Sequence, residues 1–266
     1  MKTAGDKLEK LREILKGYGD KVAVAFSGGV DSTFLLSMAA ETLEKVLAVT
    51  VNADFVAQSE VDAAHRTAEE LGVEHRILYV PFSDIDKFAE NPPDRCYFCK
   101  RGLFDRIIKT AHESGIGTVM EGSNADDGGE HRPGLKAIEE LGIASPLAEA
   151  GLNKKEIRAL SRERGLPTWD SPDNTCLATR IRLGDEITRD KLEMVEEAEK
   201  LLKSLGFSLC RVRHHGQIAR IEVAPEKLPE LIDSEMRDRI DRKLREIGFL
   251  YVTIDMTGYS RGSMDV

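Results

Sequence analysis

The hydrophobic pattern over the first two thirds of the chain alternates between two kinds of segment. Short runs rich in Val, Ile and Ala are separated by longer segments in which apolar residues recur every three or four positions. The short runs are typical of buried β-strands and the longer segments of amphipathic helices. We expect strands at 21–26, 46–51, 75–80 and 118–121, and helices at 31–43, 60–71, 98–111 and 153–164. This alternation predicts an α/β fold, in which helices cover both faces of a parallel sheet.

The pattern changes after Pro167. The segment 169–174 is polar and contains proline, so we interpret it as a linker or an active-site loop. The elements expected beyond it are a helix at 190–205, adjacent strands at 207–214 and 217–223, a further helix, and a last strand at 249–254. We therefore predict two domains, a larger α/β domain over residues 1–168 and a smaller α+β domain over residues 169–266.

Composition narrows the classes of function. The 266 residues include 38 Lys and Arg against 47 Asp and Glu, which gives a net charge of −9. This acidic balance argues against nucleic acid as a partner, because such binding depends on neutralising phosphates, and it favours a small anionic ligand. The chain has no apolar run of membrane-spanning length and starts with a charged amphipathic stretch, which predicts a cytoplasmic protein without a membrane partner. In that reducing compartment its four cysteines favour metal binding or catalysis over disulfides.

A glycine-rich segment lies between the first expected strand and the first expected helix. Its residues are Ser27, Gly28, Gly29, Val30, Asp31 and Ser32. Glycines allow the backbone to turn and approach a ligand, and the helix that follows presents free N–H groups and a positive dipole end to an anion. The two serines add hydroxyl donors. The segment is therefore predicted to bind phosphate.

A second polar loop follows the fourth expected strand. Its candidate ligand-binding residues are Gly122, Ser123, Asn124 and Asp127. The carboxyl ends of parallel strands lie at one edge of the sheet, where ligands of such folds bind, so we expect this loop beside the first. Its acidic side chains could hold magnesium or could simply cap a turn, and the sequence leaves both interpretations open.

Three of the cysteines are candidate ligands or nucleophiles. Cys96 and Cys99 form a Cys-x-x-Cys pair at the start of a helix, where thiol pKa values are lowered, and Cys176 has charged and polar neighbours. Zinc would need two more Cys or His ligands, and the chain has no second close pair. Three thiolates can hold a 4Fe-4S cluster and leave one iron open to sulfide. The fourth, Cys210, lies in an apolar strand and is interpreted as a buried structural thiol.

The glycine-rich segment resembles the SGGxDS signature of the PP-loop ATP pyrophosphatases. It lacks the Gly-Lys-Ser/Thr ending of a Walker loop. The resemblance implies a Rossmann-like, adenine nucleotide alpha hydrolase-like sheet and ATP cleavage between the α and β phosphates. It also implies that the loop holds pyrophosphate and that Asp31 holds Mg2+.

Further motifs resemble the LarE family over nearly the whole chain. Besides the two loops, they are Arg132-Pro133-Gly134, Pro146-Leu147, Lys155-Glu156-Ile157-Arg158 and Cys176-Leu177-Ala178-Thr179-Arg180-Ile181. LarE enzymes are homo-oligomeric sulfur transferases of nickel-pincer nucleotide cofactor synthesis. Their substrate is a pyridinium biscarboxylic acid mononucleotide, whose carboxylates are adenylated and become thiocarboxylates.

The resemblance implies roles for individual residues. Cys96, Cys99 and Cys176 would bind a 4Fe-4S cluster that a sulfide donor supplies. In another branch of the family, the cysteine matching Cys176 gives up its own sulfur and becomes dehydroalanine. The residues implied to be catalytic are Cys176, Asp31 and Arg180.

The substrate's phosphate would need cationic partners. Arg211 and Arg213 stand two positions apart on a strand, hence on one side of it, and Arg180 is a third candidate. Glu222, on the neighbouring strand, resembles a family position in the same pocket. Two other functions stay open: a tRNA thiolation enzyme, which would need a broad basic surface, and a non-catalytic nucleotide-binding module whose cysteines bind a structural zinc.

Overall fold

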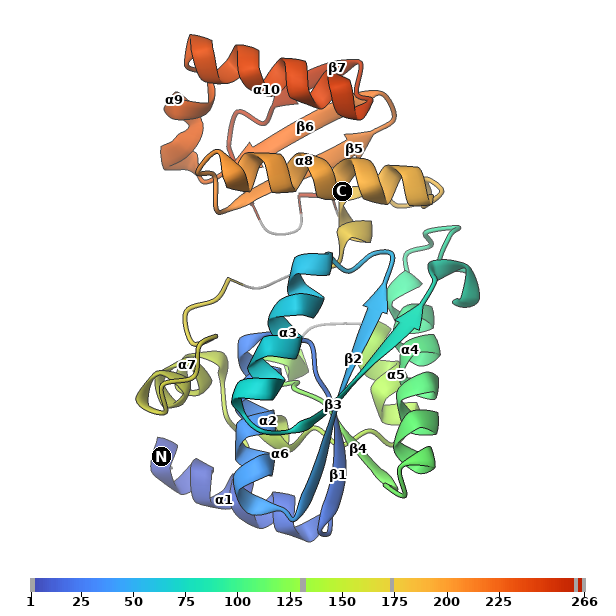
Figure 1. Cartoon of the computed structure of the whole chain (residues 1–266), viewed down its shortest axis with the longest axis vertical. Coiled ribbons are helices and arrows are strands. Elements are labelled where there is room, and N and C mark those ends of the chain that lie inside the picture. Colours follow the sequence, from blue (N-terminus) through green and yellow to red (C-terminus); the bar gives the residue numbers. More distant parts are fainter. Residues whose placement is uncertain (1–2, 130–132, 173–174, 261–262, 265–266) are drawn as a thin grey trace. The chain divides into compact units, whose positions relative to one another are not determined.

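A computed structural model describes residues 3–129, 133–172, 175–260 and 263–264. The chain forms two compact units (Figure 1). The first unit comprises Met1–Asp86 and Asp94–Asn174, and the second comprises Lys87–Pro93 and Thr175–Val266. The functional boundary after residue 168, between an ATP-binding and a substrate-binding domain, stays a prediction.

The first unit contains the predicted parallel sheet. Its strands are β1 (Lys21–Ala25), β2 (Lys45–Ala53), β3 (Glu74–Val80) and β4 (Thr118–Met120). They lie in the order β3-β2-β1-β4, and every neighbouring pair is parallel. The chain thus proceeds outward from β1 to β3 and then crosses back to place β4 on the other side of β1. The strand order reverses between β1 and β4, which is where α/β sheets of this kind bind ligands.

Helices cover both faces of this sheet, as predicted (Figure 1). They are α1 (Ala4–Gly17), α2 (Val30–Thr42), α3 (Gln58–Glu70), α4 (Arg95–Glu113), α5 (Pro133–Glu140), α6 (Pro146–Ala150) and α7 (Lys154–Glu163), with the 3-10 turns η1 (Phe82–Asp84) and η2 (Ala125–Gly129). Successive strand residues face opposite sides. Val22 of β1 therefore packs in a core cluster with Phe34 of α2, whereas Ala23 packs in another with Phe104 of α4.

The second unit is a smaller α+β fold. Its strands β5 (Cys210–His215), β6 (Ile218–Val223) and β7 (Tyr251–Ile254) form a mixed sheet, in which β5 pairs antiparallel and β7 parallel with β6. The other elements are η3 (Leu177–Arg180), α8 (Arg189–Ser204), η4 (Pro225–Lys227), α9 (Leu228–Leu231) and α10 (Ser234–Ile247). Phe207 and Phe249 lie in its core. In neither unit is any described helix both long and apolar enough to cross a membrane.

A short segment from the first half of the chain, Lys87–Pro93, belongs to the second unit. Asn91 is fully buried there, and its side-chain amide donates to the carbonyl oxygens of Arg182 and Asp185 at 2.7 and 3.1 Å. The backbone N–H of Gly184 donates to the carbonyl oxygen of Asn91 at 2.9 Å. These bonds fix the segment that immediately precedes the Cys96 helix.

Candidate active site

The glycine-rich segment forms the turn from β1 into α2. Gly29 is the N-cap residue of α2 and has no side chain with which to cap the first N–H groups. Those groups and the positive end of the helix dipole are therefore available to an anion. This local arrangement is the one that the sequence predicts.

The two serines and Gly28 give the loop its shape. The hydroxyl oxygens of Ser27 and Ser32 lie 3.1 Å apart, and the Ser32 hydroxyl donates to the carbonyl oxygen of Gly29 at 3.2 Å. Gly28 has a φ of +72°, and a Cβ atom there would lie 3.0 Å from the Cβ of Ala64 in α3. A side chain at position 28 is therefore disfavoured both by the backbone conformation and by the approach of α3.

Asp31 lies in the first turn of α2 and forms an ion pair that the sequence analysis missed. Its Oδ2 accepts a hydrogen bond from the Nζ of Lys154 at 2.7 Å, and Lys154 is the first residue of α7. A lysine in the first turn opposes the helix dipole, which is the signal that could have identified it. Asn153 is the N-cap residue of α7 and forms reciprocal bonds with Glu156.

The loop after β4 lies against the glycine-rich loop. A Cβ atom on Gly122 would be 3.0 Å from the backbone nitrogen of Ser32, so the two backbones are in close contact. The backbone N–H of Asn124 donates to Asp127 at 3.0 Å, and the backbone N–H of Lys154 donates to Asp126 at 3.0 Å. In the structure these carboxylates therefore bond with the backbone of the loop and of α7. Magnesium binding at Asp127 stays a prediction.

Glu121, at the end of β4, is a buried carboxylate that the sequence analysis did not single out. It accepts from the backbone N–H and the hydroxyl of Ser123 at 3.0 and 2.9 Å, and from the hydroxyl of Ser145 at 2.6 Å. The Nζ of Lys100, which follows Cys99 in α4, lies 3.9 Å away. Glu121 thus fixes the backbone and the side chain of Ser123. The available signal was a charged residue at the end of an apolar strand.

The close contact at Gly122 leads to a prediction. We expect Gly122→Ala to lower the rate of ATP-dependent pyrophosphate release by about tenfold to a hundredfold, because the added methyl group separates two loops that must align on one nucleotide. Gly117→Ala is the matched control, since a Cβ atom there would meet nothing within 4 Å. Equal rates in the two variants would mean that the contact between the loops is unimportant for ATP cleavage.

The predicted cysteine ligands lie in both units. Cys96 and Cys99 are near the start of α4, three positions apart and so on one helix face, and both have solvent access. Cys176 is the N-cap residue of η3 in the second unit and is also partly accessible. Solvent-accessible thiols are able to bind an iron–sulfur cluster. Among the described residues, however, no three Cys, His, Asp or Glu side chains lie close enough together to hold a metal ion. The cluster stays a prediction.

Cys210 is buried, as predicted. Burial, with a smaller contribution from the neighbouring Glu199 carboxylate, raises the pKa of its thiol to about 12. The thiol therefore stays protonated at neutral pH and is neither a nucleophile nor a metal ligand there.

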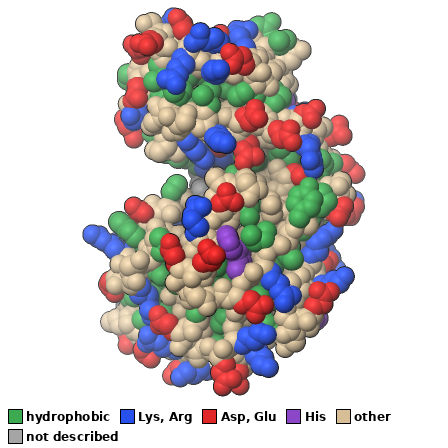
Figure 2. All heavy atoms as spheres, viewed as in Figure 1, with side chains coloured by type: hydrophobic (Ala, Val, Ile, Leu, Met, Phe, Trp, Pro, Cys, Tyr) green, Lys and Arg blue, Asp and Glu red, His purple; other side chains and the backbone are tan. Residues whose placement is uncertain are grey.

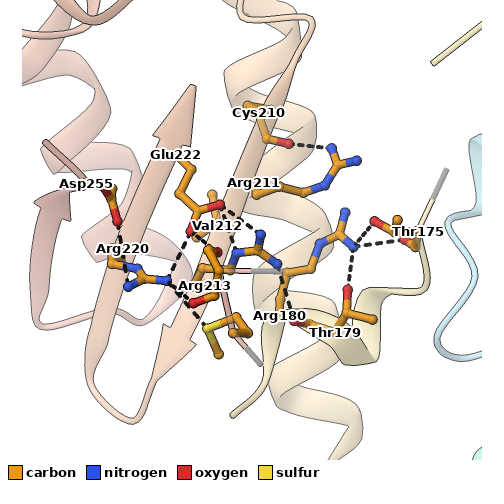
Figure 3. Close-up of polar contacts among 12 residues, drawn as sticks. Thr175, Thr179, Arg180, Cys210, Arg211, Val212, Arg213, Arg220, Glu222 and Asp255 are labelled. Carbon is orange, nitrogen blue, oxygen red and sulfur yellow. Dashed lines mark hydrogen bonds and ion pairs between the residues drawn. The ribbon is translucent and has the colours of Figure 1, made fainter. Parts of the chain in front are cut away.

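The second unit buries a group of arginines and carboxylates between η3, β5 and β6 (Figure 3). The Nε and Nη2 of Arg213 donate to Glu222 at 3.1 and 2.8 Å, and Arg220 donates to its other oxygen at 3.0 Å. The guanidinium of Arg211 donates to the carbonyl oxygen of Cys210 at 2.7 Å and lies 5.2 Å from the ring centre of Tyr259. The structure thus brings the predicted residues Arg211, Arg213 and Glu222 together.

Arg180 joins this group and organises the cysteine segment. Its Nε and Nη2 donate to the two carboxylate oxygens of Glu199 in α8, at 2.8 and 3.0 Å. Its Nη1 donates to the carbonyl oxygens of Thr175 and Cys176, at 2.9 and 3.0 Å. Both charged side chains are almost fully buried. The described contacts of Arg180 therefore hold the backbone on which Cys176 lies, and contact with a substrate stays a prediction.

Comparison with known proteins agrees with this architecture. Residues 19–126, which include the glycine-rich loop and the second loop up to Asp126, match the family model described as asparagine synthase. An uncharacterised protein of Synechocystis sp. is 37% identical over 97% of this chain and 97% of its own. A tRNA-specific 2-thiouridylase of Rickettsia felis is 30% identical, but over 59% of this chain and 54% of its own.

A characterised relative spans both units. The pyridinium-3,5-bisthiocarboxylic acid mononucleotide synthase of Lactiplantibacillus plantarum is 38% identical over 92% of this chain and 89% of its own. A match of that extent includes the second unit as well as the nucleotide-binding sheet. The chain therefore belongs to the LarE family and is an ATP-dependent sulfurtransferase built on a PP-loop α/β domain.

Proposed function

We propose that the protein uses ATP to convert carboxylates of pyridinium-3,5-biscarboxylic acid mononucleotide to thiocarboxylates. The observation that carries this proposal is the 38% identity over 92% of the chain to a synthase of the corresponding bisthiocarboxylic acid product. The two loops at the strand-order reversal support it, because they provide the nucleotide site that carboxylate activation needs.

In the proposed reaction, a substrate carboxylate attacks the α phosphate of ATP and pyrophosphate leaves. The free N–H groups at the start of α2, with Ser27 and Ser32, bind the departing pyrophosphate. Asp31 would hold Mg2+, which neutralises phosphate charge. The acyl-adenylate has AMP as its leaving group, so a sulfur nucleophile can then attack the acyl carbon and release AMP.

The arginine group of the second unit is proposed to bind the substrate. Arg211 and Arg213 supply positive charge for the nucleotide phosphate, and Glu222 fixes the Arg213 guanidinium through the bonds described above. Arginines that are held by a carboxylate lose little further side-chain freedom when they bind a phosphate. A site of this kind is therefore preorganised.

A direct product assay tests the proposed function. The protein, purified anaerobically, is incubated with Mg·ATP, the biscarboxylic acid mononucleotide and sulfide. Mass spectrometry should find a product in which sulfur has replaced a carboxylate oxygen, formed only when ATP is present. Pyrophosphate release without any sulfur-containing product would contradict the proposal while leaving the ATP site intact.

The source of the sulfur gives a second test. We propose that Cys96, Cys99 and Cys176 hold a 4Fe-4S cluster. Each single alanine variant is expected to lose its bound iron and to stop inserting sulfur into the substrate. Pyrophosphate release should persist, because the PP-loop is unchanged. Cys210→Ala is the control, since that thiol is buried and protonated. Iron and sulfide analysis, with product counted per chain, measures these outcomes.

The sacrificial alternative predicts a different pattern. If Cys176 supplied its own sulfur, the Cys96→Ala and Cys99→Ala variants would keep wild-type product formation. Each wild-type chain would stop after one sulfur transfer, and mass spectrometry would find dehydroalanine at position 176. That combination would overturn the cluster proposal.

The cytoplasmic location, the homo-oligomer and the external sulfide donor also remain predictions. Membership of a sulfurtransferase family argues against the non-catalytic zinc module. Figure 2 shows basic and acidic side chains intermixed on the visible face, with no broad basic patch there. This distribution and the net charge of −9 support a small-molecule substrate over tRNA.

A further inference from the structure

The helix α7 carries a row of basic side chains whose partners lie at two different places. Lys154, Arg158 and Arg162 are spaced four residues apart, which places them along one side of the helix. Lys154 pairs with Asp31 of the PP-loop at 2.7 Å. The other two contact the segment 169–171, which leads toward Cys176.

Arg158 makes two hydrogen bonds to the backbone of this segment. Its Nη1 donates to the carbonyl oxygen of Trp169 at 2.9 Å, and its Nη2 donates to that of Ser171 at 2.8 Å. One turn later, the guanidinium of Arg162 lies 4.9 Å from the ring centre of Trp169. The two Arg158 hydrogen bonds have a charged donor and are stronger than bonds between neutral groups. The Arg162 guanidinium is attracted to the face of the Trp169 ring.

Two backbone hydrogen bonds also hold the segment. The backbone N–H of Ser171 donates to the carbonyl oxygen of Thr168 at 3.1 Å, and that of Trp169 donates to Leu166 at 3.4 Å, which is a long bond. Trp169 is partly buried, whereas Asp170 and Pro172 are exposed. The two Arg158 bonds are the shorter and charge-assisted ones, so their loss should loosen the segment.

The anchored point lies close to Cys176 along the chain. Cys176 is five positions after Ser171, so their Cα atoms are at most about 18 Å apart whatever path the backbone takes. From Lys154 to Arg158 the helix rises by about 6 Å. The helix α7 thus joins Lys154, which pairs with Asp31 of the PP-loop, to the start of the linker that leads to Cys176.

We propose that α7 anchors residues 169–171, the start of the linker that leads to Cys176, and that Arg158 is the positioning residue. The inference rests on the proposed function, in which sulfur delivered at Cys176 must reach an acyl group activated at the PP-loop. Arg158 contacts neither ATP nor the reacting atoms in this account. By holding this segment, Arg158 shortens the lifetime of the acyl-adenylate before sulfur attacks it. Less of the adenylate is then hydrolysed by water.

The test compares Arg158→Met with Arg164→Met in the full-length protein. Arg164, the C-cap residue of α7, bonds instead to Glu41 at 2.5 and 2.9 Å, so it is a charge-matched control. In Arg158→Met we expect amide hydrogen exchange at Trp169 and Ser171 to rise by about tenfold or more. We expect pyrophosphate release near the wild-type rate but about tenfold less thiocarboxylate per pyrophosphate. Arg164→Met should match the wild type in all three measurements.

Arg158→Lys provides a second variant, because an ammonium can replace only part of the fork-shaped contact. The amide hydrogen exchange rate of Arg158→Lys at Trp169 and Ser171 should lie between those of the wild type and Arg158→Met. The same order should hold for the thiocarboxylate formed per pyrophosphate released. Unchanged exchange in Arg158→Met, or faster exchange with unchanged product per pyrophosphate, would overturn the inference. If the wild type made no thiocarboxylate at all, the proposed function would fail, and the exchange comparison alone would decide whether Arg158 orders the segment.

Discussion

Asp31→Asn is expected to lower ATP-dependent pyrophosphate release by about a hundredfold or more, the order found when one electrostatic contact to a transition state is lost. Asparagine has the shape of aspartate but no charge, so it binds Mg2+ weakly and cannot form an ion pair with Lys154. The present pair, at 2.7 Å, gives Lys154 a defined position beside the loop. Without it, the ammonium loses this contact with the loop. Pyrophosphate release with saturating substrate measures the effect.

The change at Asp31 should leave the fold intact, because its side chain is about one fifth exposed and lies on the loop side of α2. Asp20→Asn removes the same charge from an exposed position just before β1 and is the matched control. Both variants should unfold at the temperature of the wild type. If Asp31→Asn released pyrophosphate as fast as Asp20→Asn, the assignment of the ATP site to this loop would be wrong.

The PP-loop and its sheet could be predicted because their signals are local. An apolar strand, a glycine turn and a largely apolar helix follow one another within 21–43, and the capping box at Asn153 and Glu156 spans four residues. The strands of the second unit also follow from their alternating pattern and are adjacent, as predicted. The short helices α5 and α6 were not predicted, since so few turns give no clear period.

The partners of the site residues could not be predicted, because they are distant in sequence. Lys154 reaches Asp31 across 123 positions, and Asn91 reaches Asp185 across 94. Glu199 bonds with Arg180 across only 19 positions, but its place in α8 looks like that of any surface glutamate. In each case a charged or polar side chain is buried only because another element covers it. Sequence periodicity describes one element at a time and contains no such information.

The bonds of Arg180 make it the residue whose loss should cost most stability. Arg180→Met leaves the Glu199 carboxylate, 3% exposed, without its cationic partner, and a broken buried pair costs about 3–5 kcal/mol of the free energy of unfolding. It also removes the donor shared by the carbonyl oxygens of Thr175 and Cys176. Urea unfolding of the second unit measures the loss. Arg182→Met, at an exposed position, should change stability by less than about 0.5 kcal/mol.

A double variant separates this structural role from the role in substrate binding that the sequence suggests. Glu199→Gln keeps an oxygen to accept from the backbone N–H of Val212, a bond of 3.1 Å, while removing the unpaired charge. Arg180→Met combined with Glu199→Gln should therefore recover much of the lost stability, because the pair then leaves no unpaired buried charge. The cysteine segment would still lack its donor, so sulfur insertion should stay low after the fold has recovered. If Arg180→Met alone unfolded like the wild type but no longer bound the mononucleotide, its guanidinium would act on the substrate and not on the Cys176 backbone.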